Sequence, residues 1–497
     1  MNVSEPAARV KGRAWALPGH GEDELSTRLR PRHDAAKMNR LTKSWFGPEL
    51  VAVSPLHTGC LELPERAGSR AGAEELLINK RTQLSWLARI RTFDSLRLYR
   101  DYRYLWAGNF CANCAQWLQL LSVGWLVRDL TASTGSSALL VVTAGGLNTV
   151  PVLFLGPWGG VLGDRINRRK LVMTLQAFMA CTALLFAFLV RSDYIEWWHA
   201  YVYVVVGGSC HAVTLPLRQA LVANTVPRES VVNAFASNIF TVTGTRMLGP
   251  FIGGVLIATL GFFWNFAWES ALYTGTVLAY WRMRTPYSHG NAAAVKASLL
   301  SSLKEGITYV RKGERVIFNL IVLGLIPNAV LNPVMFLLPI FTTEVLHGGA
   351  DLGGILLSTT GLGGFIAAFT IASGGFKSRR GLVCLGAIAA SSVCIIILSQ
   401  ARWPVVAILL VGMMSFAQGT FRTTSGSVIQ YMTPDVLRGR VTSLQSYAQG
   451  FLILTSLLIG WFIDLTTVVI GIMTIGAVGL GLAILSSLAF RRVRQLA

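Results

Sequence analysis

Long apolar stretches alternate with short charged ones along most of this chain. Twelve predominantly apolar runs, each long enough to cross the hydrocarbon core of a bilayer as a helix, follow one another after residue 103. These runs are 104–127, 138–162, 171–190, 197–217, 231–260, 262–281, 316–341, 352–375, 382–400, 404–421, 441–463 and 468–490. Their apolarity does not alternate with a period of two, which favours helices over strands. The pattern predicts an all-α integral membrane protein with twelve transmembrane helices.

Composition agrees with this class, and the basic residues orient the chain. Hydrophobic residues make up 53% of the sequence and charged residues only 14%. Most basic loop residues, Arg218 and Arg422 among them, fall on one side of the predicted membrane, against Arg128, Arg191 and Arg402 on the other. The positive-inside bias then predicts cytoplasmic termini. The net charge of +20 reflects these loops and their attraction to anionic lipids, so no nucleic-acid partner is expected.

Two segments lie outside the apolar runs. Residues 1–97 are predicted to be a mostly disordered cytoplasmic leader, because most of them mix Pro, Gly, Arg and Glu without periodicity. Within it, 83–91 fits a short basic helix on the membrane surface, and a later start at Met38 is an alternative reading. Residues 285–315 are predicted to be a cytoplasmic linker containing an amphipathic helix.

The linker divides the runs six and six. We therefore expect two pseudo-symmetric six-helix bundles, at 98–284 and 316–497. Similar sequence segments follow the fourth and tenth runs, and a partial copy of one charged loop, which we call the echo loop, follows the eighth run. Both indicate duplication.

That charged loop is a hairpin between the second and third runs. Residues 160–170 read GVLGDRINRRK, and glycines of this kind let two helices approach closely. An acid at a helix end accepts hydrogen bonds from the N-terminus of a neighbouring helix, and a nearby arginine can pair with it. Such contacts form only when the helix ends close together.

Two halves of six runs, the basic linker and this loop together resemble the major facilitator superfamily of secondary transporters, over about 98–494. The resemblance implies that the loop is a latch for the outward-facing state, formed by Gly160, Gly163, Asp164, Arg165, Arg168 and Arg169. Asn167 stands where glycine is usual, and Asn tolerates the left-handed backbone. The alternative is that the basic residues only anchor the topology.

A second motif lies in the fifth run. Its Gly-Pro-x-x-Gly-Gly core resembles the signature of drug and proton antiporters, although the preceding glycine is displaced by one position. The motif residues are Gly244, Arg246, Gly249, Pro250, Gly253 and Gly254. A helix kink that serves packing alone is the alternative, since proline frees a carbonyl and glycines permit close contact.

Arg246 and Glu269 are charges inside the predicted membrane segments. A guanidinium midway along a span costs on the order of several kcal/mol unless it faces water or an acid. Glu269 is its expected partner by residue type, and the pair is our candidate for proton coupling because its state would change with conformation. A structural salt bridge is the alternative.

Substrate contacts are expected from the first, fourth, seventh and tenth runs, which border the central cavity in this superfamily. The candidates are Asn109, Asn113, Gln116, His211, Asn328, Asn332 and Gln418. With Trp106 and Trp117 nearby, they favour a bulky amphipathic small molecule. Hydrogen bonding between helices is the alternative, and the commoner role of membrane Asn and Gln.

The segments 98–106 and 216–222 resemble the transmembrane secretion effectors, the bacterial branch that includes enterobactin exporters and macrolide efflux proteins. We expect a monomeric, proton-coupled exporter of a drug, siderophore or secreted metabolite, working by alternating access in the cell membrane. An uptake symporter and a non-transporting sensor or assembly factor are the alternatives. The sequence shows no metal site, cofactor motif, ATP-binding loop or enzyme active site, and reduced cysteines are expected.

Overall fold

The computed structural model describes residues 94–132, 137–286, 308, 315–373, 379–434, 441 and 452–496, without the side chains of 157–161, 163–165 and 372. The predicted leader up to residue 93, the amphipathic face of the linker helix and the glycines of the echo loop lie outside the described residues. Residues 81–497 form one compact unit by their contacts.

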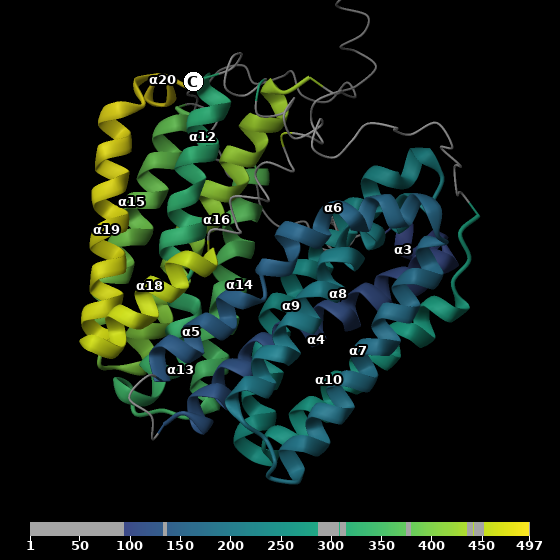
Figure 1. The fold of residues 1–497 in the computed structure, drawn as a ribbon. Helices are drawn as coiled ribbons and strands as arrows, with labels where there is room; N and C mark the ends of the chain where they lie inside the picture. Colours follow the sequence, from purple (N-terminus) through teal and green to yellow (C-terminus); the bar gives the residue numbers. More distant parts are fainter. Residues whose placement is uncertain are drawn as a thin grey trace, which may run out of the picture. The chain divides into compact units, whose positions relative to one another are not determined.

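All regular elements in the described ranges are helices (Figure 1). The first group comprises α3 (Asp94–Leu98), α4 (Arg100–Leu130), α5 (Ser137–Leu147), α6 (Val150–Arg165), α7 (Arg168–Arg191), α8 (Trp197–Asn224), η2 (Arg228–Ser230), α9 (Val231–Leu260) and α10 (Phe262–Arg282). The second comprises α12 (Arg315–Leu325), η3 (Ile326–Leu331), α13 (Val334–Glu344), α14 (Ala350–Ala372), α15 (Arg380–Ser399), α16 (Pro404–Met432), α18 (Leu452–Leu465), α19 (Val468–Ala489) and α20 (Arg491–Arg494).

The helices have the length and apolarity of membrane spans. Within the described ranges, nine helical segments are long and apolar enough to cross a bilayer, and α18 is a shorter apolar helix. Helices α4 and α10, with 31 and 21 residues, have comparable lengths but carry more polar side chains. The all-helical membrane class is confirmed, whereas the count of twelve spans and the side of the termini stay predictions.

Two predicted spans are interrupted. The run 138–162 is two helices, α5 and α6, with Asn148 and Thr149 between them. Pro151 explains the break, since it has no N–H for the carbonyl of Leu147 and its ring would clash with that group. The run 316–341 is divided in the same way, because η3 is a π-helical turn with Pro327 near its start and Pro333 precedes α13.

The boundary between the fifth and sixth runs is where the sequence places it. The fifth and sixth runs are separated by Gly261 alone, whose φ of +83° is a conformation that glycine adopts without strain. At the start of α7, Asn167 is the N-cap, and its side chain accepts a hydrogen bond from the Lys170 backbone N–H. Its φ of −57° is not left-handed, so the expected reason for Asn at this position is wrong and capping replaces it.

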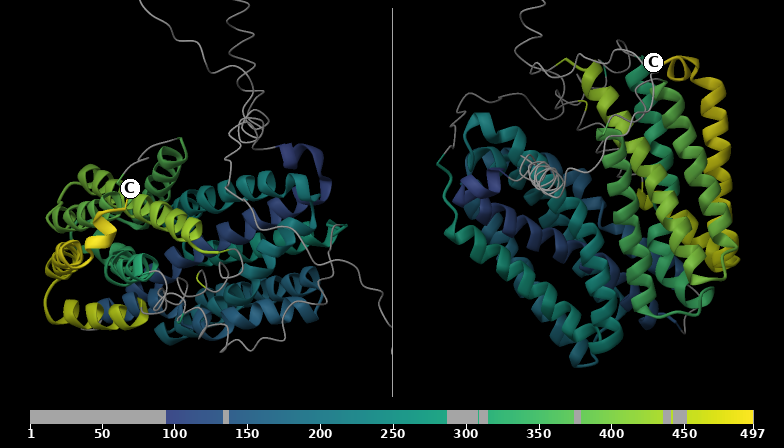
Figure 2. Two further views of the ribbon diagram at one scale, coloured as in Figure 1. Left: turned by 90° about the horizontal axis from the view of Figure 1, so that it is seen from above. Right: turned by 180° about the vertical axis from the view of Figure 1, so that it is seen from behind.

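Helices near in sequence form two groups, seen from two further directions in Figure 2. In the first group α4 packs on α9 and α10, α7 on α10, and α6 on α8; in the second, α14 packs on α16 and α15 on α16 and α19. The most extensive contacts between the groups are α9 with α14 and α5 with α18, and α4 and α5 also contact α13. Buried apolar side chains from both groups form one continuous cluster.

The extent of α8 and α16 corrects the loop assignment of two arginines. The predicted spans end at residues 217 and 421, one residue before Arg218 and Arg422. The helices continue to Asn224 and Met432, so both arginines lie inside helices. Arg218 is buried, with 4% of its side chain exposed. The sequence prediction therefore ended each span at an arginine, although the helix continues beyond it.

Candidate functional site

Several predicted substrate contacts instead join helices. Asn109 is buried, donates to Asn238 Oδ1 at 3.1 Å and accepts from the Tyr280 hydroxyl at 2.7 Å, which links α4 to α9 and α10. Gln418 of α16 donates to Ser391 Oγ of α15 at 3.2 Å. These bonds match the alternative reading of membrane amides as connections between helices.

Three more candidates do not line either of the cavities described below. Asn328 donates to the carbonyl of Gly324, one turn earlier, at 2.9 Å. Asn113 is buried and Asn332 half-buried, and neither lines the two cavities described below. The structure therefore does not bring the seven candidates together at one place.

An apolar cavity of about 470 Å³ lies between α4, α5, α8, α13 and α14. Its wall includes Leu121, Val141, Val204, Phe336 and Leu357, with Gln119 and Asn148 as the polar members. Both groups of helices contribute side chains to its wall. Its lining suits an amphipathic molecule.

A second, more polar cavity of about 310 Å³ lies within the first group, and we call it the Arg218 cavity. Its polar lining comes from α4, α7, α8, α10 and the break between α5 and α6: Gln116, Gln119, Asn148, Gln176, His211, Thr214, Arg218 and Tyr273. Gln116 and His211 are the predicted candidates that reach it. Gln119 and Asn148 line both cavities.

Sequence reasoning missed most of the Arg218 cavity. Asn148 could have been found from the helix break that Pro151 imposes. Arg218 lies seven residues after His211 and four after Thr214, on one helix face, but it was counted as a loop cation.

Glu269 is fully buried on α10. Its Oε1 accepts a hydrogen bond from the Tyr203 hydroxyl at 2.6 Å, and Oε2 has no partner among the described residues. The ring of Tyr203 stacks on Phe186 with centroids 4.4 Å apart, and Phe266 packs edge-on against both rings. A carboxyl group thus sits in aromatic surroundings with one neutral donor.

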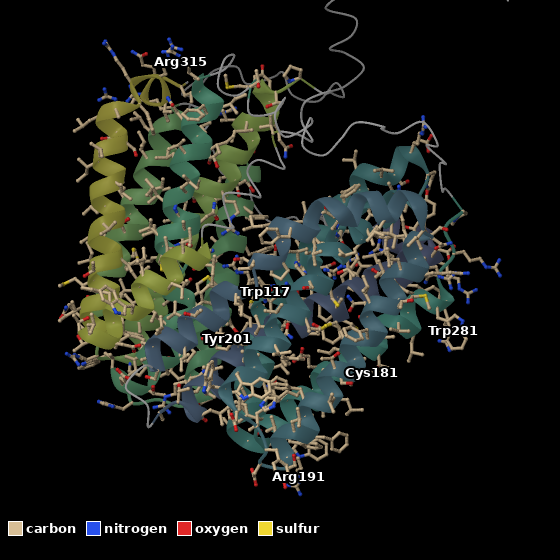
Figure 3. The ribbon with its side chains drawn as sticks, in the orientation of Figure 1. Trp117, Cys181, Arg191, Tyr201, Trp281 and Arg315 are labelled. Carbon is tan, nitrogen blue, oxygen red and sulfur yellow. The ribbon has the colours of Figure 1, made fainter. Side chains whose placement is uncertain are left out.

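Arg246 does not pair with Glu269, so that expectation is wrong. The Arg246 guanidinium lies over the ring of Trp117, 5.0 Å from its centroid, and its Nη2 is 3.7 Å from Met335 Sδ. Trp117 is labelled in Figure 3. Arg246 thus contacts α4 and α13, whereas Glu269 contacts α8. Met335 also lines the apolar cavity.

The antiporter-like motif on α9 is a packing surface at most of its positions. A Cβ atom on Gly249 would lie 2.9 Å from the carbonyl oxygen of Cys114 on α4. One on Gly254 would lie 2.6 Å from the carbonyl oxygen of Ala350 and 2.9 Å from Gly354 Cα, both on α14. Gly253 faces Leu121 at 3.2 Å, whereas nothing lies within 4 Å at Gly244. Pro250 stays within the continuous helix α9.

The predicted latch is only partly within the described residues. Gly160 and Gly163 belong to the backbone of α6, and the side chains of Asp164 and Arg165 lie outside the described set. Arg168 starts α7 and is half-buried. Arg169 donates through Nε to the carbonyl of Tyr280 at 2.7 Å and through Nη2 to that of Trp281, so it ties the start of α7 to the end of α10.

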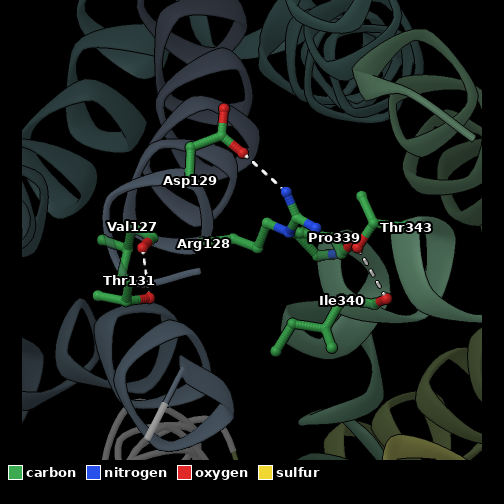
Figure 4. A network of polar contacts seen from close by, with 7 residues as sticks. All are labelled: Val127, Arg128, Asp129, Thr131, Pro339, Ile340 and Thr343. Carbon is green, nitrogen blue, oxygen red and sulfur yellow. Dashed lines mark hydrogen bonds and ion pairs between the residues drawn. The ribbon is translucent and has the colours of Figure 1, made fainter. Parts of the chain in front are cut away.

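The opposite helix ends also carry polar contacts. At the end of α4, Arg128 and Asp129 form an exposed ion pair of 3.2 Å, and Thr131 donates to the carbonyl of Val127 (Figure 4). Nearby, Asp464 of α18 accepts from the backbone N–H groups of Ala138 and Leu139, at 2.9 and 3.1 Å. Asp464 therefore caps the N-terminus of α5 and connects the two groups of helices.

Metal and redox sites are not indicated by the described residues. The six cysteines within them are free thiols, and no group of three His, Cys, Asp or Glu side chains in those ranges is placed to hold a metal.

Comparison with known proteins gives the family. Residues 92–496 match the family model described as transmembrane secretion effector. The staphyloferrin A transporter of Staphylococcus aureus is 24% identical over 377 residues, which cover 74% of this chain and 90% of that protein. The enterobactin exporter EntS of Shigella boydii is 23% identical over 363 residues, covering 72% of this chain and 83% of that protein.

A solved structure gives the fold independently. The crystal structure of the POT family transporter PepTSo superposes with a TM-score of 0.63 at 14% identity, covering 80% of this chain and 98% of that one. The chain belongs to the transmembrane secretion effector family of the major facilitator superfamily, and it is a multi-pass transporter of the cytoplasmic membrane and not an enzyme.

Proposed function

We propose that this protein is a proton-coupled exporter of a siderophore-like, amphipathic small molecule. It works as a monomer by alternating access between two six-helix bundles, with twelve spans and cytoplasmic termini. Two relatives, a staphyloferrin A transporter and an enterobactin exporter, support the substrate class, and the exporter supports the outward direction. The Gly-Pro-x-x-Gly-Gly segment of α9 supports export as well.

The apolar cavity supports a substrate site between the bundles. Side chains from α4, α5 and α8 on one side and α13 and α14 on the other line its wall. Arg246 places a cation beside this cavity, because its guanidinium contacts Met335, which lines the wall. The Trp117 ring covers one face of that guanidinium. A wall that is mainly apolar with one nearby cation fits an amphipathic molecule that carries negative groups.

Glu269 is the observation that carries the coupling proposal. It is fully buried, it accepts from Tyr203 alone, and no cation pairs with it among the described residues. A carboxylate buried without a counter-ion costs free energy that binding a proton removes. The group is thus suited to hold a proton in this conformation and to release it when the helices rearrange and water reaches it.

Uptake into everted membrane vesicles tests direction and coupling together. Enterobactin and staphyloferrin A serve as probes, with the vesicle interior made acidic by respiration. An exporter accumulates a probe inside such vesicles, and dissipating the pH gradient with nigericin stops it. Accumulation only in right-side-out vesicles would indicate an uptake symporter, and no gradient-dependent flux of either probe in either orientation would contradict the proposal.

The latch is tested in the same vesicles. The resemblance assigns the outward-facing latch to Asp164, so Asp164→Asn is expected to reduce accumulation. Exposed Glu229 on η2 provides the matched control, since Glu229→Gln also removes one carboxylate on the same predicted side of the membrane. Equal activity of the two variants would remove the latch role from Asp164.

A further inference from the structure

We propose that the Arg218 cavity binds a small oxyanion, a carboxylate or a phosphate, inside the first group of helices. The site adjoins the apolar cavity, with which it shares Gln119 and Asn148, and it depends neither on the direction of transport nor on its coupling to protons. Four observations carry the proposal: the burial of Arg218, its missing partners, the polar lining of the cavity, and the surplus of hydrogen-bond donors there.

Arg218 lies deep in the protein without a partner. Only 4% of its side chain is exposed, and its Nε and Nη1 make no hydrogen bond to any residue that the structure describes. No described acid forms an ion pair with it. Buried arginines are normally paired, because a desolvated guanidinium without an anion is costly. An anion from solution would supply the missing partner.

The space next to Arg218 is partly polar. The cavity comprises about 310 Å³, open solvent included, and Arg218 shares its wall with neutral polar side chains from its own helix and from other helices. Two of them, Thr214 and His211, are on its own helix, four and seven residues earlier. Gln116 of α4, Gln176 of α7 and Tyr273 of α10 also line the cavity.

Several polar atoms in the lining of the cavity have no hydrogen-bond partner among the described residues. Besides the two Arg218 nitrogens, the donor Gln119 Nε2 and one acceptor, Gln176 Oε1, also lack hydrogen-bond partners within the described chain, so unpartnered donors outnumber unpartnered acceptors. Glu269, the acid one turn before Tyr273 on α10, is bonded to Tyr203 instead. The cavity thus contains a permanent cation and neutral donors, while the carboxylate on the adjacent turn is directed elsewhere.

This donor set selects oxyanions. A guanidinium presents parallel N–H groups that fit two oxygens of a carboxylate or phosphate. Amide and hydroxyl groups around it can donate to the remaining oxygens. A carboxylate would belong to an organic solute, and a phosphate to a free inorganic ion, so the two sources share one chemistry and can be separated by experiment.

Ligand-dependent thermal stability of the purified protein in lipid nanodiscs tests the site without any gradient. Sodium citrate, sodium acetate and sodium phosphate are titrated separately at constant ionic strength set with sodium chloride, and tryptophan fluorescence reports the melting temperature. A saturable rise with citrate or acetate alone indicates a carboxylate site, and a rise with phosphate alone indicates an inorganic anion site. Either result supports the proposal, and no saturable rise with any probe overturns it.

Variants locate the effect. Arg218→Gln is expected to weaken binding by about tenfold or more, the scale of a charge-assisted hydrogen bond, and Arg218→Lys by less. Exposed Arg191 at the end of α7, labelled in Figure 3, gives the matched control, and Arg191→Gln should bind as the native protein does. Equal binding by Arg218→Gln and the native protein overturns the proposal.

Two further variants keep the test open if Arg218→Gln fails to fold. Gln116→Leu and Thr214→Val retain the cation and remove neutral donors, so weaker binding is expected in at least one, and unchanged binding in both contradicts the site. The variant Asp164→Asn provides an additional test. If anion binding is absent in the native protein and appears in Asp164→Asn, the chain itself neutralises Arg218 and the proposal fails. Because no transport is measured, these outcomes are independent of the proposed export.

Discussion

The contact between α9 and α14 makes a quantitative prediction, for Gly254→Ala. The added Cβ would lie 2.6 Å from the Ala350 carbonyl oxygen, about 0.8 Å inside the ordinary contact limit of 3.4 Å, and 2.9 Å from Gly354 Cα. Both neighbours are backbone atoms, so one helix must move away from the other. Overpacking of this kind costs about 1–3 kcal/mol.

Helix propensity acts in the opposite direction and has to be separated from packing. Alanine is better than glycine in a helix by about 1 kcal/mol. Gly244 lies on the same helix, and a Cβ there has nothing within 4 Å. Gly244→Ala therefore gains the propensity term alone, and the difference between the two variants isolates the packing cost at about 1–3 kcal/mol.

Reversible unfolding in mixed micelles of mild detergent and sodium dodecyl sulfate measures this difference. Gly244→Ala should unfold at a higher fraction of dodecyl sulfate than the native protein, and Gly254→Ala at a lower fraction than Gly244→Ala. If both substitutions stabilise the protein equally, α9 and α14 do not approach as closely as described.

Substitutions test three further contacts, two of them with a control variant. Asn109→Ala should destabilise the protein by about 1–3 kcal/mol in the same unfolding assay, because Tyr280 loses a buried acceptor; Gln116→Ala, at the cavity wall, should leave stability within about 0.5 kcal/mol, and the reverse order would contradict these roles. Asp464→Ala removes the cap of α5 and should cost about 0.5–2 kcal/mol. Asp129→Ala, in an exposed ion pair, should cost less than Asp464→Ala and about 1 kcal/mol at most; equal costs would refute the cap. Tyr203→Phe leaves the buried carboxyl without its donor and should destabilise by about 1–3 kcal/mol, which an unchanged unfolding midpoint would disprove.

The membrane class could be predicted from the sequence because it depends on the length and apolarity of runs. The boundary at Gly261 was also predictable, since a single glycine between two apolar runs permits a sharp turn. Helix interruptions at Pro151 and Pro333 follow from proline chemistry, but long apolar runs on both sides conceal them. Arg218 was misplaced because an arginine after an apolar run resembles a loop cation, and only the packing of α8 shows that the helix continues.

Side-chain partners were the least predictable feature. Arg246 and Glu269 suit each other by charge, but which way each points depends on helix rotation, which apolar periodicity does not define on helices that are apolar all round. The amides on α4 illustrate the same limit. Asn109 and Gln116 share a face at spacings of four and three through Asn113, yet one joins three helices and the other lines a cavity.

Proton coupling through Glu269 is the central claim, and one pair of flux measurements in proteoliposomes tests it most directly. Glu269→Gln keeps an acceptor for Tyr203 but cannot exchange a proton. With enterobactin or staphyloferrin A as the probe, this variant should retain exchange of labelled for unlabelled probe at equal concentrations on both sides. It should lose net transport driven by an imposed pH gradient, while Glu229→Gln keeps both. Net transport by Glu269→Gln at the native rate and with the native dependence on the gradient would contradict the claim.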